Sequence, residues 1–223
     1  HEKRHRAVQE KMIQRFDADN FRAICDQLAK RDADLKRILK TRGYPSMWTR
    51  PNSFQTLILT ILEQQVSLAA AYAAFKRLKE RIGTVTPDKL AALSDEDLRA
   101  CYFTRQKIVY ARGLTEAIQS KQIKLRALHY QPDESVREQL ITLKGIGNWT
   151  IDVYLMHALR RTDLFPLGDI ALVNSLKHIK QLPDDISKED MLEIAAQWRP
   201  NRTIAAMILW HDYMQRRKVT VKD

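Results

Sequence analysis

The sequence predicts an all-α protein. Apolar residues recur at spacings of three and four along nearly the whole chain, which is the period of an amphipathic helix. No run alternates apolar and polar residues for long enough to indicate a half-buried strand. Capping residues also stand at many of the expected helix ends.

Taken in order, the first half shows these helices clearly. The segment near 20–30 has helical spacing, and 33–42 is expected to begin after Asp32 and to end at Gly43. Asn52 or Ser53 can cap SFQTLILTILEQQ. The remaining signals are Ser67 before LAAAYAAFKRLKERI, Gly83 after it, and short helical turns around Pro87 and after Ser94.

The second half continues the pattern. A longer helix is expected over 105–120, and Asp133 can cap another that runs through Leu143. NWTIDVYLMHALRR then has helical spacing. The last signals are capping-box spacing at Ser187 and Asp190, and Pro200 in the first turn of a final helix that ends near Met214.

Charge indicates the class of partner. The chain has 38 Lys and Arg against 27 Asp and Glu, a formal charge of +11, and its calculated pI is about 9.7. Such a balance favours nucleic acid, bound through phosphate contacts and counterion release, over a basic surface without a specific partner. A composition of 44% hydrophobic and 29% charged residues is that of an ordinary globular protein.

The sequence also argues against several other classes. Cys25 and Cys101 are far apart and match no disulfide framework and no zinc or iron-sulfur spacing, so both are expected to pack as small apolar residues. No apolar run approaches the roughly 20 residues that cross a bilayer, and no membrane association is expected. We expect a cytoplasmic protein associated with the bacterial nucleoid, or a nuclear one in a eukaryote.

The stretch LKGIGNWTID at 143–152 stands out in a chain with few glycines. Gly145 and Gly147 permit a tight reversal between two helices and leave room for a close ligand, while Ile146 is expected to pack inward. Backbone N–H groups in such a turn, with the N-terminus of the next helix, can hold a phosphate. The alternative is an ordinary turn between helices.

A second candidate site is LFPLGDIALVNSL at 164–176, where Asp169 precedes a helix. Aspartate at this place is commonly an N-cap, and that role is compatible with chemistry. A carboxylate at a helix N-terminus is favoured in its ionised form and can face a cationic transition state. Trp149, Tyr154 and Trp210 add indole and phenol rings, which either pack in the core or stack on a base.

Together these residues resemble the helix-hairpin-helix (HhH-GPD) DNA glycosylase superfamily, and within it the 3-methyladenine DNA glycosylase II branch. The resemblance extends from about Pro51 to Tyr213. It rests on four ordered blocks: ILEQQVSLAAA at 61–71, LSDEDLRACYFTRQKIVYARGL at 93–114, LKGIGNWTIDVYLMHAL followed by DLFPLGD at 143–169, and WRPNRTIAAMILWHDY at 198–213.

The resemblance implies a two-lobed helical core with the active site in the cleft between the lobes. One lobe would comprise residues 52–160 with the hairpin at 143–149, and the other residues 1–51 and 161–223, which carry the catalytic aspartate. Asp169 would be that aspartate. Trp149, Trp210, Tyr154, Val153 and Ile170 would form the base pocket, although Val153 and Ile170 stand where some relatives have tyrosines.

Further roles follow from the same resemblance. Lys144, Gly145, Ile146 and Gly147 would contact DNA at the hairpin, and Gln65 would fill the gap left by the flipped nucleotide. Backbone carbonyls of Ile141, Leu143 and Ile146 would coordinate a structural Na⁺ or K⁺ ion. No cofactor would be needed for catalysis and no iron-sulfur cluster would be present. We expect a monomer that binds damaged double-stranded DNA.

The implied reaction is hydrolysis of the N-glycosidic bond of an alkylated purine, of the 3-methyladenine or 7-methylguanine type, in base excision repair. The product is an abasic site. Members that also cut the backbone carry a lysine where this chain has Trp149, so no lyase activity is expected. Two alternatives stay open: a glycosylase for deaminated or oxidised bases, and a helix-hairpin-helix module that binds DNA without catalysis.

Overall fold

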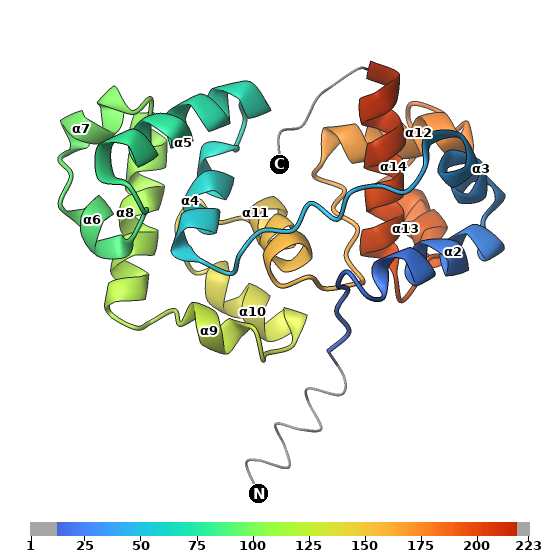
Figure 1. Ribbon diagram of the computed structural model, residues 1–223, viewed down its shortest axis with the longest axis horizontal. Helices are drawn as coiled ribbons and strands as arrows, with labels where there is room; N and C mark the ends of the chain where they lie inside the picture. Colours follow the sequence, from blue (N-terminus) through green and yellow to red (C-terminus); the bar gives the residue numbers. More distant parts are fainter. Residues whose placement is uncertain (1–12, 218–223) are drawn as a thin grey trace, which may run out of the picture. The chain divides into compact units, whose positions relative to one another are not determined.

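The computed structural model describes residues 13–217, and these are almost entirely helical (Figure 1). The only β pairing among them is an isolated antiparallel bridge between Arg15 and Arg161. The predicted all-α class is therefore confirmed. Within the same residues, no helix is both long enough and apolar enough to cross a membrane.

The chain divides into two compact units. Arg50–Tyr154 belong to the first, and Gln14–Thr49 together with 155–217 belong to the second. The change of unit after Tyr154 is earlier than the expected boundary at 160. The reason is that Met156 packs in the core of the second unit and the carbonyl of Arg160 accepts a hydrogen bond from the N–H of Phe16 at 3.0 Å.

The helices of the first unit follow one another with short connections. They are α4 (Phe54–Leu62), α5 (Leu68–Ile82), α6 (Pro87–Ala91), α7 (Asp95–Ala100), α8 (Arg105–Gln119), α9 (Leu125–Leu128), α10 (Asp133–Leu140) and α11 (Asn148–Val153). Helix α4 packs against α5, α8 and α11, and Figure 1 shows α4 beside α11. Every residue of α4 except Gln55 is buried, which makes this helix the centre of the unit.

The second unit combines segments from far apart in the sequence. It contains α2 (Phe21–Arg31), α3 (Ala33–Arg42), α12 (Ile170–Lys180), α13 (Lys188–Ala196) and α14 (Arg202–Arg217). Helix α14 contacts α2, α3 and α12. A π-helical turn, Tyr154–Ala158, continues α11 and leads into this unit.

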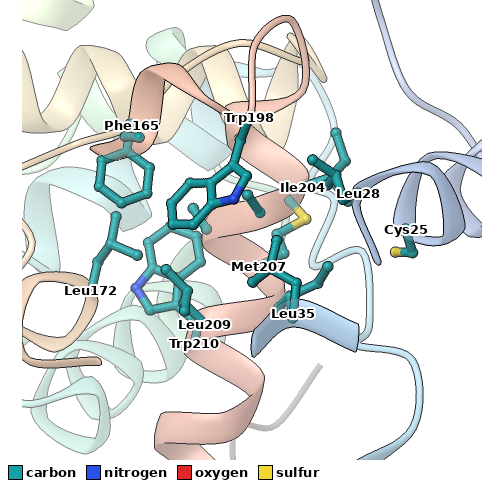
Figure 2. Packing of buried hydrophobic residues seen from close by; sticks show 14 of the residues in the cluster. Cys25, Leu28, Leu35, Phe165, Leu172, Trp198, Ile204, Met207, Leu209 and Trp210 are labelled. Carbon is teal, nitrogen blue, oxygen red and sulfur yellow. The ribbon is translucent and has the colours of Figure 1, made fainter. Parts of the chain in front are cut away.

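Buried aromatic and aliphatic side chains form the core of the second unit. Figure 2 shows Phe165, Trp198 and Trp210 among the aliphatic side chains of α14 and its neighbours, and the rings of Phe165 and Trp198 are 5.7 Å apart. Cys25 lies in this core at 0% exposure, as predicted for a small apolar residue. Burial, with a smaller contribution from Asp26, raises the pKa of Cys25 to about 12.

A buried polar network crosses the same core. The carboxylate of Asp32 caps α3 by accepting from the N–H groups of Asp34 and Leu35. It also accepts from Lys180 Nζ at 2.7 Å and from Trp198 Nε1 at 2.9 Å. Asp32 therefore joins α3 to α12 and to the segment after α13, and its cap role, predicted from sequence, is confirmed.

Most other predicted helix ends are confirmed as well. Ser53 and Ser67 accept the cap hydrogen bonds of α4 and α5, and Gly83 ends α5. At the N-terminal ends of helices, two expectations are wrong. Asp133 is the first residue of α10 rather than its cap, and Pro200 precedes α14 instead of lying in its first turn.

Candidate active site

The hairpin between α10 and α11 is a tight turn over residues 141–147. The N–H of Ile146 donates to the carbonyl of Leu143 at 3.1 Å, and the Ile146 side chain is 2% exposed. Ile146 thus packs inward, as predicted. Gly147 is exposed and is the N-cap residue of α11, and Lys144, three residues earlier in the chain, is also exposed. The turn therefore presents backbone and a lysine to solvent.

Gly145 is required by its neighbours as well as by the turn. Its φ of +83° lies in the region that residues with side chains rarely adopt. A Cβ atom built on Gly145 would lie 2.1 Å from Cγ of Tyr110 on α8. The aromatic ring of Tyr110 therefore packs directly on the glycine backbone, a contact that the sequence pattern did not indicate.

Two side chains hold the hairpin to its surroundings. Arg137 on α10 donates to Asn148 Oδ1 at 2.9 Å and to Asp152 Oδ1 at 2.5 Å, and so ties α10 to α11. Burial raises the pKa of Asp152, although Arg137 opposes that shift. From α4, Gln64 Nε2 donates to the carbonyl of Gly145 at 2.8 Å. Sequence analysis did not single out Gln64, and only its place next to Gln65 in the QQ pair could have drawn attention to it.

Gln65 follows directly and has a different environment. It is exposed, and its φ of +56° is left-handed, which is unusual for a residue other than glycine. Such a conformation turns the chain sharply between α4 and α5. The structure therefore places Gln65 on a tight, solvent-exposed turn beside an anchored neighbour.

The carbonyls expected to coordinate a cation belong to Ile141, Leu143 and Ile146, at and after the C-terminus of α10. The carbonyl of Leu143 uses one lone pair for the N–H of Ile146, which leaves one. Neutral oxygen donors at the negative end of a helix suit a hard cation such as Na⁺ or K⁺. The donor chemistry of these residues fits the ion that the resemblance implies.

Asp169 is held at the N-terminus of α12 in the second unit. Its Oδ1 accepts from the N–H of Leu172 at 2.8 Å, so it is the N-cap that the sequence predicts. The same oxygen accepts from Nε1 of Trp210 on α14 at 3.2 Å. Both of these hydrogen bonds use Oδ1, and within residues 13–217 no donor contacts Oδ2. Oδ2 is therefore the carboxylate oxygen that could act on a substrate.

Trp210 is the contact that links Asp169 to the helical core. Its side chain is 8% exposed, and its ring stacks on His157 with centroids 5.8 Å apart and an interplanar angle of 28°. Nδ1 of His157 lies 2.8 Å from the carbonyl of Trp48. One face of the Trp210 indole is thus covered by a held imidazole, and its N–H is directed at Asp169.

The other predicted pocket residues have varied surroundings. In the first unit Trp149 is half-buried and Val153 is buried. Tyr154 is 1% exposed and its hydroxyl donates to Asn52 at 2.5 Å, so it offers no accessible ring face for stacking. In the second unit Ile170 is 77% exposed, next to Asp169.

Metal-binding side chains do not cluster in the described part of the chain. No group of three or more His, Cys, Asp or Glu within it could hold a metal ion. The chemistry available at the described sites is that of a carboxylate with one free oxygen, indole rings, and backbone groups of the hairpin.

A glycine hairpin between two helices and an aspartate that caps a later helix are the two features on which the resemblance to known proteins chiefly rests. The family model of the HhH-GPD superfamily of base excision DNA repair proteins matches residues 58–200. This chain therefore belongs to the HhH-GPD superfamily, and the resemblance inferred from its motifs is confirmed.

Within that family, the proteins that are similar to this chain in sequence and in structure include 3-methyladenine glycosylases. A putative DNA-3-methyladenine glycosylase of Bacillus subtilis is 32% identical over 165 residues, which are 70% of this chain and 58% of that protein. The chain thus spans little more than half the length of that relative.

Two solved structures have the same fold. DNA-3-methyladenine glycosidase of Bacillus halodurans superposes with a TM-score of 0.73 and 29% identity, over 92% of this chain and 94% of that one. A 3-methyladenine DNA glycosylase of Schizosaccharomyces pombe, in complex with abasic DNA, gives a TM-score of 0.75 and 28% identity, over 86% of this chain and 95% of that one.

Proposed function

We propose that this protein is a monofunctional DNA glycosylase that removes alkylated purines from double-stranded DNA and leaves an abasic site. The observation that carries the proposal is Asp169, held at a helix N-terminus with one carboxylate oxygen free. The names of its relatives support the same substrate class.

Breaking the glycosidic bond builds positive charge on the sugar. Oδ1 of Asp169 is fixed by two N–H donors, so the carboxylate needs no reorganisation when that charge develops. Oδ2 would then face the sugar or the attacking water, which it can position or deprotonate. An alkylated purine already carries positive charge and leaves readily, so little acid catalysis is required.

The indole ring of Trp149 would assist by stacking on the flipped base. Trp149 is half-buried and retains an indole surface, and a cationic base on such a ring gains about 0.5–2 kcal/mol. The tryptophan at this position supplies no amine, and attack on the sugar carbon by a lysine is therefore not part of the reaction. The expected product is an abasic strand that remains uncut.

DNA is gripped by the hairpin. The backbone of the half-buried Gly145 and the exposed Gly147 would offer N–H groups to a phosphate, and the exposed Lys144 adds a charge. Gln65, on its left-handed turn, would fill the space left by the flipped nucleotide. A monovalent cation held by the carbonyls of Ile141, Leu143 and Ile146 would brace the turn.

The remaining expectations belong to the same proposal. Catalysis needs no cofactor, the protein acts as a monomer, and it works where cellular DNA is found. The formal charge of +11 supports a polyanionic partner.

The proposal is tested by single-turnover release of 7-methylguanine from a duplex, with wild type beside Asp169→Asn. Asparagine caps helices about as well as aspartate, so α12 is preserved while the charge is lost. We expect release and an intact abasic strand with wild type, and binding without release with the variant. Equal release by both proteins would refute the role of Asp169. Binding without release by both would favour another lesion or a pure binding module, which a panel of deaminated and oxidised bases would separate.

A further inference from the structure

The end of α4 is unusually well anchored for a helix terminus. Buried Lys107 on α8 donates from Nζ to the carbonyl of Leu62 at 2.7 Å. Arg50 makes a two-pronged ion pair with Glu63, at 2.6 Å and 2.9 Å. Gln64 reaches the hairpin. Three consecutive residues are therefore each held by a contact with a distant segment.

Gln64 makes two hydrogen bonds through one nitrogen. Besides the carbonyl of Gly145, Nε2 contacts Oγ1 of Thr150 at 3.0 Å. Gly145 belongs to the hairpin, and Thr150 lies in the first turn of α11. One amide therefore joins the end of α4 to both parts of the phosphate-binding hairpin.

The anchored residues Leu62, Glu63 and Gln64 are followed directly by the left-handed turn at Gln65. Gln65, next in sequence, has a φ of +56° and is exposed. On its far side, Ser67 caps α5 by accepting from the N–H of Ala70 at 3.2 Å. A left-handed residue other than glycine persists only where its surroundings determine it, and here both flanks of the turn are held.

We propose that Gln64 is a positioning residue that sets the Gln65 turn relative to the phosphate-binding hairpin. It makes no contact with the reacting atoms. The side-chain amide of Gln64 binds the carbonyl of Gly145. Because Gln65 is the next residue, the same contact fixes the backbone position of Gln65 relative to the hairpin. The two DNA contacts, one to a phosphate and one to the space left by a flipped nucleotide, are thereby kept at a constant separation. This inference rests on the proposed function of Gln65 and the hairpin.

The test measures DNA binding, which does not require base release. Fluorescence anisotropy gives the dissociation constants for a duplex with one tetrahydrofuran abasic site and for the same duplex undamaged. Gln64→Met keeps the side-chain size and removes the N–H donors, and Gln64→Ala removes the side chain. The matched control is Gln55→Ala, because Gln55 also lies on α4 and also binds a distant backbone group, the N–H of Val85 at 3.2 Å.

We expect both Gln64 variants to lower the preference for the abasic duplex about tenfold, since two hydrogen bonds to the hairpin are lost. Gln55→Ala should leave that preference unchanged. In a Gln65→Ala background, Gln64→Met should have little further effect, because Gln64 acts on this preference through Gln65. Circular dichroism melting identifies the temperature range in which each variant is folded, and binding is compared there.

Several results would overturn the inference. They are an unchanged preference in Gln64→Met, an equal loss in Gln55→Ala, an independent effect of Gln64→Met when Gln65 is alanine, or a wild type that binds both duplexes equally. Failure of the proposed function looks different. A wild type that prefers the abasic duplex but releases no 7-methylguanine would contradict the substrate while leaving the role of Gln64 intact.

Discussion

Replacing Gly145 by alanine tests how the hairpin is built. The backbone at φ +83° disfavours any side chain, at about 1–2 kcal/mol. The new Cβ would lie 2.1 Å from the Tyr110 ring, and relieving such overpacking costs about 1–3 kcal/mol more. Gly145→Ala should therefore lower the free energy of unfolding by roughly 2–5 kcal/mol.

A second glycine, Gly113, serves as the control for this substitution. Gly113 lies inside α8, where an added Cβ would meet nothing within 4 Å. Gly113→Ala should stabilise the protein by about 0.5–1 kcal/mol through the helix preference of alanine. Urea unfolding followed by circular dichroism measures both variants against wild type.

The two contributions at Gly145 can also be separated. In a Tyr110→Ala background the steric part disappears, so the cost of Gly145→Ala should fall to the backbone part of about 1–2 kcal/mol. If Gly145→Ala unfolds at the wild-type urea concentration, or costs the same with and without Tyr110, the reasoning from backbone conformation and close packing is refuted.

Three other expectations can be checked with single variants. Trp210→Phe keeps a ring but loses the N–H to Asp169, and because hydrogen bonds to charged groups contribute about 1.5–3 kcal/mol, single-turnover base release should slow at least about tenfold. Unchanged release would show that this N–H does not support the carboxylate. Burial acts to raise the pKa of Asp32, but hydrogen bonds from Lys180, from Trp198 and from the backbone N–H of Leu35 outweigh it and leave that pKa lowered. The ionised Asp32 carboxylate therefore stabilises the folded protein above the pKa of about 3.9 that the group has in the unfolded chain. This stabilisation is lost as pH falls through the lower pKa that the group has in the folded protein. Urea unfolding should therefore show Asp32→Asn less stable than wild type at pH 7, with the difference shrinking below about pH 4, whereas a constant difference would contradict the sign. Finally, Lys144→Ala should weaken binding to damaged and undamaged duplexes alike and reduce the slope of log affinity against log salt by about one, and an unchanged slope would mean that Lys144 makes no phosphate contact.

Local signals in the sequence were sufficient for most helices. Asp32, Ser67 and Gly83 act at helix ends as predicted, because a cap depends on hydrogen bonds and dihedral angles within a few residues. The end of α4 was misplaced, since SFQTLILTILEQQ reads as helix through Gln65 whereas the helix stops at Leu62. Lys107 on α8 holds the carbonyl of Leu62 from 45 residues away, and Arg50 pairs with the side chain of Glu63, so contacts outside the helix act at its end.

For the candidate site, the sequence predicted the local position of Asp169. Asp169 was placed at a helix N-terminus from its neighbours, and the structure confirms that position, while its catalytic role stays a prediction. The resemblance placed Tyr154 in the base pocket, and that role stays a prediction; the structure shows that its side chain is buried and donates a hydrogen bond to Asn52. A helical period gives the face on which a residue lies and does not say what covers that face.

By itself, the sequence determined the helical class, most helix ends, the glycine turn, the family and the place of Asp169 on a helix N-terminus. All of these depend on the order of neighbouring residues. Only the tertiary structure decided that Trp210 donates to Asp169, that Tyr110 packs on Gly145, and that Gln64 holds a carbonyl 81 residues away. Such contacts are made by side chains from separate helices, and which of them meet is set by how the helices pack rather than by any local pattern.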